Sequence, residues 1–243
     1  DSNASRGLGD VYKRQEVGYM NNVKLIAHTT PVSSFSFDSG QNTLEDLIAY
    51  MARVSNPGNQ RNTATARKLI KYLVKHKHWS PLEMVNAVLE VETTRDIGRQ
   101  ILRHRSFSFQ EFSQRYADPT SELEFVMREA RLQDDKNRQN SLVLDEKNKD
   151  HNWLISEWET HQNRIINYCN AMYTWATKHG IAKEQARAVL PEGMTMSRMY
   201  MNGSLRSWIH YIELRTDPST QKEHREVAQM CAFEIAKVFP LIK

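Results

Sequence analysis

The sequence RQILRHRSFSFQEFSQRY occupies residues 99–116 and carries more fixed polarity than a buried element normally holds. Four arginines, one histidine and one glutamate stand among its aromatic rings. Its first half predicts a helix, in which spacings of three and four place Gln100, Arg103 and His104 on one side. Three hydrogen-bond donors are therefore expected to converge at the end of a helix.

The second half of this stretch predicts an extended segment. Residues 106–109 alternate hydroxyl and aromatic side chains with period two, as a strand does. Glu111, Ser113 and Arg115 continue the alternation and are expected to project from one side. A run of arginine and glutamine on a helix is more often a solvated face. If this run instead forms a site, its natural partner is an anion with flat rings.

The order of residues in this stretch also resembles a known signature. Arg103-His104-Arg105, seven residues, then Ser113 is similar to the signature of the flavin-dependent thymidylate synthases, the ThyX family. Four fixed residues over so long a spacing are a specific signal. The resemblance covers residues 53–225, with its motifs in the family's order.

The composition is that of an ordinary soluble globular protein. The 243 residues suffice for one sizeable core, and 40% of them are hydrophobic and 26% charged. The net charge of +4 and the isoelectric point near 9.0 fit an anionic ligand as readily as nucleic acid. No apolar run approaches the roughly 20 residues of a membrane helix, and no signal peptide is found, so a cytoplasmic location without a membrane partner is expected.

Two segments are predicted along the chain. Residues 1–19 show no periodicity, look like vector-derived or translated upstream sequence, and are set apart as a disordered or peripheral segment. Residues 20–243 are predicted to form a single domain of the α+β class. We expect a small, mostly antiparallel sheet packed by several long helices, the fold that the ThyX resemblance implies.

Hydrophobic periodicity predicts the individual elements. Strands are expected near residues 23–26 and 85–91, and a mobile polar excursion over 134–150. Amphipathic helices are expected over residues 44–54, 66–75, 153–179, 181–190 and 205–215, with a last one ending at 239. Ser80 is predicted to open a capping box, and Asp217 to cap the last helix. Gly180 is predicted to end the longest helix.

The two cysteines, Cys169 and Cys231, lie in helix-patterned apolar stretches and are expected to be reduced, buried thiols. Neither stands beside an activating base, so no thiolate nucleophile is expected. The pair His76 and His78 suggests metal ligands, but no further ligand of suitable spacing follows. No metal site is therefore predicted.

Arginines occur at three separated places: within residues 103–115, at Arg187 and at Arg215. Guanidinium groups match phosphate bidentately and keep their charge in a dry pocket. The sequence has no glycine-rich phosphate loop that could do this instead. The arginines together therefore predict a pocket for an anionic ligand.

The resemblance implies an enzyme that methylates dUMP to dTMP. Members of the family bind FAD, take hydride from NADPH, use methylenetetrahydrofolate as carbon donor and need no cysteine nucleophile. Their pockets join neighbouring subunits of a homotetramer. The residues implied to surround dUMP are Gln100, Arg103, Glu111, Ser113, Gln114, Arg115, Arg187 and Arg215. The residues implied to hold FAD are Ser55, His78, Ser80, Glu83, Arg103, His104, Arg105, Glu111, Ser204, Arg206 and His210.

Arg215 has the most chemical of the implied roles, and we expect it to be catalytic. A guanidinium against the uracil edge favours the N3-ionised pyrimidine and raises electron density at C5, the carbon that receives the methylene. Ser113 suggests a nucleophile, but no His-Asp pair is spaced to activate it, so substrate binding is preferred. Ser204 and Ser219 stand where the family commonly has an asparagine and a ring-stacking histidine, which leaves their flavin contacts open.

Two other classes of function stay open at this point. Aromatic residues interleaved with arginine and serine over 103–116 also suit a nucleic-acid-binding module. The basic residues are spread over several helices instead of one stripe, however, so no nucleic-acid partner is expected. A helical structural protein with a polar interface is the second alternative. Flavin absorbance of the purified protein would separate these possibilities.

Overall fold

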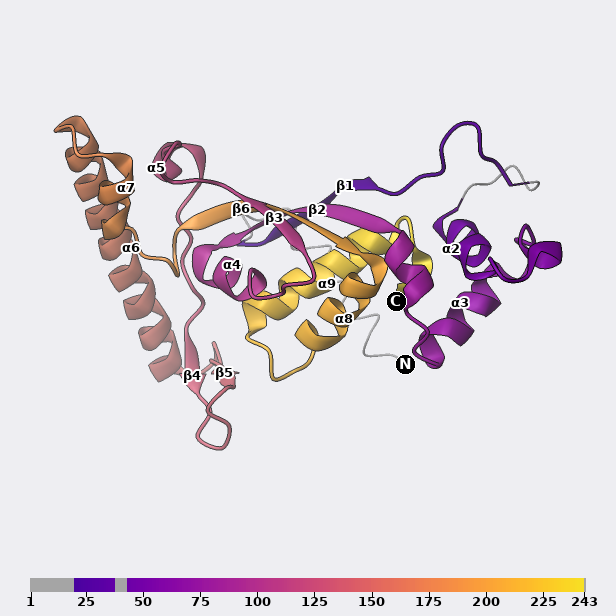
Figure 1. Ribbon diagram of the computed structural model, residues 1–243. Helices are drawn as coiled ribbons and strands as arrows, with labels where there is room; N and C mark the ends of the chain where they lie inside the picture. The colour runs from indigo at the N-terminus through magenta and orange to yellow at the C-terminus, as the bar shows by residue number, and fades with distance from the viewer. Residues whose placement is uncertain (1–19, 38–42, 243) are drawn as a thin grey trace.

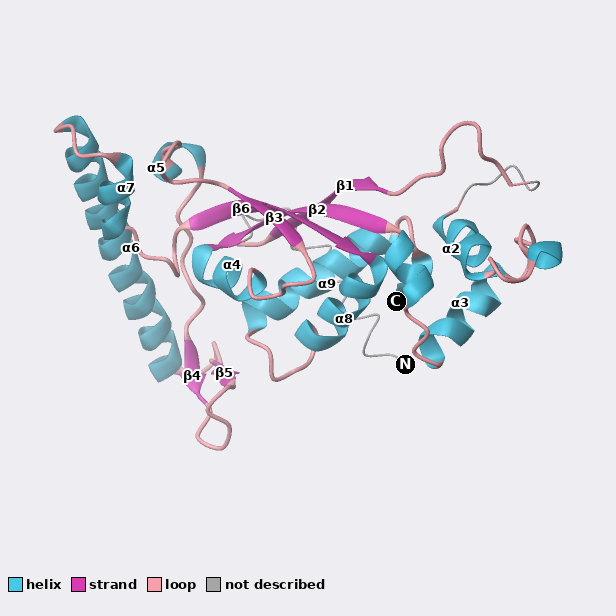
Figure 2. Ribbon diagram, in the orientation of Figure 1, coloured by secondary structure: helices cyan, strands magenta, loops and turns pink. Residues whose placement is uncertain are grey.

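The computed structural model describes residues 20–37 and 43–242. At its centre lies a four-stranded antiparallel sheet in the order β1-β2-β6-β3. These strands are β1 (Asn22–His28), β2 (Asn86–Thr94), β6 (Met196–Ser204) and β3 (Ser108–Glu111). Figures 1 and 2 show helices beneath this sheet and further helices beyond its two ends. The predicted α+β class with a small antiparallel sheet is confirmed.

The remaining elements surround the sheet. The α-helices are α2 (Leu44–Ala52), α3 (Ala66–Lys75), α4 (Arg95–Ile101), α5 (Pro119–Glu122), α6 (Lys149–Lys178), α7 (Lys183–Ala186), α8 (Leu205–Arg215) and α9 (Lys222–Ala236). Short 3-10 turns are η2 (Pro57–Asn59), η3 (Ser80–Met84), η4 (Arg187–Val189) and η5 (Pro240–Ile242). A separate two-stranded sheet consists of β4 (Arg131–Gln133) and β5 (Ser141–Val143).

The two central strands supply one wall of the main core. In β2, Ala87, Leu89 and Val91 are buried, and the side chains between them are more exposed. This period-two alternation favours a strand with one covered face. In β6, Met199 and Met201 are buried in the same way. The strands predicted near residues 23–26 and 85–91 are confirmed as β1 and β2.

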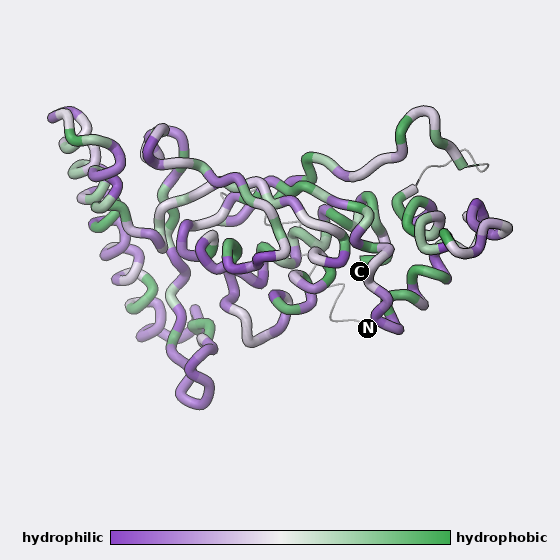
Figure 3. Tube along the Cα trace, in the orientation of Figure 1, coloured by the Kyte–Doolittle hydropathy of each residue, from purple (hydrophilic) through white to green (hydrophobic). Residues whose placement is uncertain are grey.

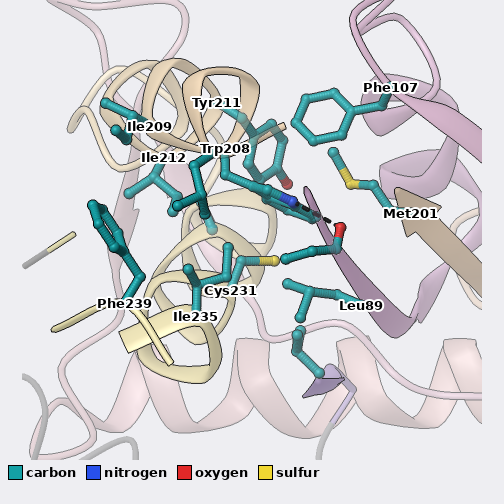
Figure 4. Close-up of a cluster of buried hydrophobic side chains, with 14 of the residues drawn as sticks. Leu89, Phe107, Met201, Trp208, Ile209, Tyr211, Ile212, Cys231, Ile235 and Phe239 are labelled. Carbon is teal, nitrogen blue, oxygen red and sulfur yellow. Dashed lines mark hydrogen bonds between the residues drawn. The ribbon is translucent and has the colours of Figure 1, made fainter. Parts of the chain in front are cut away.

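Helices α8 and α9 cover the buried face of the sheet (Figure 4). Trp208 of α8 is fully buried beside Phe107, and its indole N–H donates to the carbonyl of Ala87 at 3.1 Å. Cys231 and Ile235 of α9 fill the space next to it. Full burial of one large apolar side chain contributes roughly 1.5–3 kcal/mol. This layer therefore holds α8 firmly against the sheet.

Helical segments extend beyond both ends of the sheet (Figure 1). At one end α2 packs on α3, and Thr43 caps α2 by accepting the N–H of Asp46 at 3.1 Å. At the other end Tyr173 and Ala176 of α6 pack against Ala186 in a second, smaller core. Figure 3 shows hydrophobic residues along the central elements and a hydrophilic tip on the β4–β5 hairpin. The helices predicted at 44–54, 66–75 and 153–179 are confirmed.

The end of α6 also follows the prediction. Gly180 has a φ of +82°, a left-handed conformation that glycine adopts without steric cost. The structure does not test where the predicted domain starts, because the segment 1–19 lies outside the described residues. The division of the chain at residue 20 therefore stays a prediction.

The sequence analysis missed β6, a central strand of the sheet. Its side chains alternate between the core and the outer face, where Arg198, Tyr200 and Asn202 are exposed. Methionine favours helices and a glycine such as Gly203 weakens strands, so the local preference of this segment is poor. Pairing with both β2 and β3 overrides that preference.

The predicted helix at 181–190 is wrong in extent. The segment folds as α7 followed by η4, and Leu190 is extended, with φ of −85° and ψ of 126°. The ring of Pro191 disfavours a helical conformation for the residue before it, so the chain leaves the helix there.

The polar excursion predicted at 134–150 includes the strand β5. Its first turn is stabilised by Asp134, which accepts the N–H of Lys136 at 2.8 Å.

Two predicted caps are wrong. Ser80 begins η3 but its side chain makes no capping hydrogen bond. Asp217 accepts the N–H of Ser219 at 2.9 Å, which closes a local turn, and α9 starts only at Lys222 without a side-chain cap. At Asp217 a local hydrogen bond satisfies the backbone before α9 begins. At Ser80 a turn that contains Pro81 does so.

Replacing Gly203 with alanine is expected to destabilise the fold. An added Cβ would lie 2.4 Å from Cδ1 of Phe107, whose ring is held against Trp208. Overpacking of this kind lowers the free energy of unfolding by about 1–3 kcal/mol, which urea unfolding measures. Gly193→Ala is the matched control, because nothing lies within 4 Å of a Cβ there. Equal midpoints for the two variants would contradict the close approach of Phe107.

Candidate active site

The turn after α4 lies along α8 and is joined to it at both ends. Near the start of α8, Ser207 Oγ donates to the carbonyl of Ser106 at 3.2 Å. At its last residue, Arg215 Nε donates to Nε2 of His104 at 2.9 Å. Between them, Phe107 packs against Trp208 with ring centroids 4.8 Å apart. The rigid helix α8 therefore positions the Arg-His-Arg motif.

The predicted helix that carries this motif ends earlier than expected. α4 stops at Ile101, and the N–H of His104 donates back to the carbonyl of Ile101 at 3.0 Å in a tighter turn. Arg103 and His104 therefore leave the helix, so the predicted helix is too long, although Gln100 and His104 both lie near His224 of α9. Gln100 and Arg215 nevertheless line the same open cleft, of about 530 Å³.

Arg215 is held by an imidazole instead of a carboxylate. Burial and the positive charge of Arg215 lower the pKa of His104 to about 4, so its ring is neutral at pH 7 and accepts the guanidinium N–H. Within residues 20–37 and 43–242, no carboxylate pairs with Arg215. Its guanidinium is thus open to an anionic ligand in the cleft. The cleft is also lined by Ser219 and Gln221 and by the carboxylates of Glu213 and Asp217.

A second group of predicted residues meets at the start of α8. Glu83 of η3 forms an ion pair with Arg206, and the ring of His210 lies 4.5 Å from that of Trp79. Ser204 caps α8 by accepting the N–H of Ser207 at 3.3 Å. Three of the residues predicted for the flavin, Glu83, Arg206 and His210, are thus brought to one side of α8.

The other predicted flavin residues lie at varying places around this group. Ser55 lines a separate open cleft of about 500 Å³ between α2 and α3. His78 and Ser80 are exposed on either side of Trp79, and Ser80 is the first residue of η3. Arg103 and Arg105 are also exposed, and neither guanidinium has an ion-pair or hydrogen-bond partner in the part of the chain that the structure describes.

A third group lies on the opposite flank of α4. Glu111 accepts from Arg99 at 3.2 Å and from Ser197 Oγ at 3.0 Å. Arg115 Nε donates to the carboxylate of Glu184 at 3.1 Å. The expected projection of Glu111, Ser113 and Arg115 from one side is therefore wrong, because the chain turns after Ser113.

Arg187 belongs to this third group. Its Nε donates to the carbonyl of Glu184 at 3.2 Å. Burial lowers the pKa of Arg95, and the charges of Arg99 and, to a smaller extent, Arg187 add to this. Arg187 and Arg115 therefore share one neighbour, Glu184. No contact joins either of them to Arg215 within the described residues. One chain by itself does not gather the three predicted arginine sites.

Gln114 supplies the test of whether this group suits a ligand. The residue is only 3% exposed, yet its Nε2 has no hydrogen-bond partner among the residues that the structure describes. A buried donor without a partner costs about 1–3 kcal/mol. An acceptor-rich ligand such as a nucleotide would satisfy it, so the donor set fits the predicted substrate.

Neither cysteine lies in these groups. Both are free thiols; Cys231 is buried as predicted, but the prediction of a buried Cys169 is wrong, because its side chain is only partly covered on α6. Burial raises the pKa of both. Their thiolates are therefore disfavoured.

Among residues 20–37 and 43–242 no cluster of three or more possible metal ligands occurs. In the same residues no helix is long and apolar enough to cross a membrane.

Comparison with known proteins assigns the family. The family model described as "Thymidylate synthase complementing protein" matches residues 39–241. A probable flavin-dependent thymidylate synthase of Paramecium bursaria Chlorella virus 1 is 49% identical over 220 residues, which are 90% of this chain and 95% of the viral protein. The chain belongs to the flavin-dependent thymidylate synthase family. The resemblance predicted from the Arg-His-Arg motif is confirmed.

Other members of the flavin-dependent thymidylate synthase family match as well. The flavin-dependent thymidylate synthase of Synechocystis is 46% identical over 221 residues, covering 90% of this chain and 96% of that protein. The crystal structure of a UMP/dUMP methylase, PolB from Streptomyces cacaoi, superposes with a TM-score of 0.72 at 24% identity, over 91% and 92% of the two chains. This likeness shows that the two proteins share a fold.

The sequence analysis missed several polar residues beside the cleft of this flavin-dependent thymidylate synthase family member. His224 is fully buried in α9, and Gln221 lies next to Gln100. A signal for His224 existed, since it stands three, four and seven residues before Val227, Ala228 and Cys231 on the apolar stripe of α9. A histidine on such a stripe needs a buried partner.

Proposed function

We propose that this chain converts dUMP to dTMP, with methylenetetrahydrofolate as carbon donor and NADPH-reduced FAD as hydride source. Membership of the flavin-dependent thymidylate synthase family supports this activity. The single structural observation that carries it is Arg215, whose guanidinium lines a cleft beside a neutral histidine instead of a carboxylate.

The role proposed for Arg215 is electrostatic. Its guanidinium, set against the uracil edge, stabilises the pyrimidine that has lost the N3 proton to solvent. The negative charge then raises electron density at C5, which attacks the one-carbon unit. His104 accepts the Nε hydrogen of Arg215 and so fixes the direction of the guanidinium. No side chain of this protein needs to form a covalent bond to the uracil.

The bound flavin would supply the hydride chemistry that these side chains lack. We propose that Glu83, Arg206 and His210 hold it at the start of α8, together with the exposed Arg103 and Arg105. Guanidinium groups without protein partners suit the two phosphates of FAD. We propose that Ser55, His78, Ser80, His104, Glu111 and Ser204 complete this site.

We propose a homotetramer whose sites are shared between subunits. Within one chain, Gln114, Arg115 and Arg187 lie on the opposite flank of α4 from Arg215, with no contact between them. In a shared site, this flank of one subunit would face Arg215 of another and complete the dUMP pocket with Gln100, Arg103, Glu111 and Ser113. The two free thiols suit the cytoplasmic location that the sequence predicts.

The test is dTMP formation by the purified chain. We expect a yellow protein that forms dTMP from dUMP when methylenetetrahydrofolate and NADPH are present, and does not without FAD. The double variant Cys169→Ser and Cys231→Ser is expected to keep this turnover, since neither thiol lies at the site. A colourless protein that FAD does not reconstitute, or a folded cysteine variant without turnover, would contradict the proposal.

A further inference from the structure

A chain of hydrogen bonds runs from the buried His224 to the exposed Gln221 beside the Gln100 side of the cleft. His224 of α9 is fully buried, and its Nδ1 lies 3.2 Å from Oε1 of Gln100. Its Nε2 lies 3.2 Å from the hydroxyl oxygen of Tyr211, which is in α8. Gln100 Nε2 donates to Gln221 Oε1 at 2.9 Å, and Gln221 Nε2 donates to the carboxylate of Glu223 at 3.0 Å. Three helices are thus joined by one continuous relay.

The carboxylate at the end of the relay sets its direction. Burial disfavours the charged form of Glu223, but its backbone N–H and the nearby Arg131 and Arg128 bring its pKa below the usual value. Arg128 lies 3.5 Å from the carboxylate, and Arg131 forms an ion pair with it. An ionised carboxylate only accepts hydrogen bonds. Gln221 must therefore turn its NH₂ group toward Glu223.

Each further link follows from this orientation. With its NH₂ group on Glu223, Gln221 turns its oxygen toward Gln100, which must donate to it. Gln100 then presents its own oxygen to His224, so Nδ1 of His224 carries a hydrogen. Nε2 of the same ring is left as an acceptor for the hydroxyl of Tyr211. One orientation of every group satisfies all four bonds.

The ring of His224 is suited to this role because it stays neutral. Burial, Arg215 and His104 lower the pKa of His224 to about 3. The groups that face it are Tyr211, with a pKa that burial raises well above the ordinary value, and the neutral His104. The tautomer of His224 is therefore constant over the pH range in which enzymes are assayed.

We propose that His224 is a positioning residue that, with Tyr211, Gln221 and Glu223, holds the amide of Gln100 so that its second N–H is offered to a nucleotide in the cleft. The proposal rests on the proposed function, because it assumes that dUMP binds beside Gln100. Phosphate and uracil carbonyl oxygens are acceptors. A reversed amide would present its own oxygen to them, and the relay prevents that reversal.

Loss of the relay is expected to weaken dUMP binding more than it slows the chemistry. Without His224 the Gln100 amide is held only by the exposed Gln221, so a larger fraction of molecules carries the reversed amide, and only the fraction with the correct orientation binds well. The reversed orientation of the amide and the loss of the His224–Gln100 hydrogen bond together raise the Kd for dUMP by roughly tenfold. Arg215 keeps its contact with His104, so kcat at saturating dUMP changes much less than the Kd.

The experiment compares four variants of the flavin-loaded, full-length protein by calorimetric titration with dUMP and by steady-state kinetics. His224→Leu removes both relay bonds, and Tyr211→Phe removes only the outer one. His224→Asn restores a donor near the Nδ1 position and is expected to recover most of the affinity. Tyr200→Phe is the matched control, since its hydroxyl donates to Glu90 outside the relay.

We expect the lowest Kd for dUMP in the wild type and in Tyr200→Phe. His224→Asn and Tyr211→Phe should have intermediate values, and His224→Leu the highest. An unchanged Kd in both Tyr211→Phe and His224→Leu would overturn the proposal. If His224→Leu does not fold, two other measurements test the proposal. They are the Kd of Tyr211→Phe for dUMP and the imidazole ¹⁵N chemical shifts of His224 in the wild-type protein. Those shifts should show a neutral Nδ1–H tautomer, and an Nε2–H tautomer would overturn the relay. Wild-type protein that does not bind dUMP at all would instead overturn the proposed function.

Discussion

Arg215→Ala is expected to lower dTMP formation by roughly 100- to 1,000-fold while the protein stays folded. Among the described residues Arg215 forms no ion pair with a carboxylate, and the neutral His104 keeps its guanidinium directed. Alanine removes the charge that stabilises the ionised pyrimidine, and no neighbouring group replaces it. Steady-state kinetics, with circular dichroism as the test of folding, measure both parts of the prediction.

Two further variants make the expectation for Arg215 specific. Arg215→Lys keeps a positive charge but loses the planar fork, so we expect activity between that of alanine and wild type. Arg198→Ala removes an arginine that is bonded to Glu92 on the outer face of the sheet, and turnover should stay near the wild-type rate. Equal losses in Arg198→Ala and Arg215→Ala would argue for a general charge effect and against the proposed role.

Trp208→Ala is expected to lower the free energy of unfolding by about 3–5 kcal/mol. The side chain is fully buried, packs on Phe107 and donates to the carbonyl of Ala87 (Figure 4). Alanine leaves a cavity between α8 and the sheet and a buried carbonyl without its donor. Since α8 carries Ser204, Arg206 and Arg215, loss of this packing should also reduce activity.

Urea unfolding of the flavin-free protein measures the effect of Trp208→Ala. The matched control is Trp153→Ala in α6, because Trp153 is 65% exposed and its loss should change stability by less than about 0.5 kcal/mol. A midpoint for Trp208→Ala close to that of Trp153→Ala would show that α8 is not held as the structure indicates.

The sequence alone determined the family and the elements with strong local patterns. Arg103-His104-Arg105 with Ser113 is a motif of fixed residue types and spacing, so it identifies a relative without knowledge of the fold. The stripes of α2, α3 and α8 and the alternation of β2 record which side of each element is buried. Gly180 marks the end of α6 because only its own backbone conformation matters there.

Only the tertiary structure decided which of these elements meet. β6 has weak strand preference, and it becomes a central strand because β2 and β3 flank it. Arg215 meets His104 across 111 residues, and His224 meets Gln100 across 124. Local periodicity reports burial but not the partner, since a buried polar group is satisfied by whatever distant residue the packing of helices and strands brings to it.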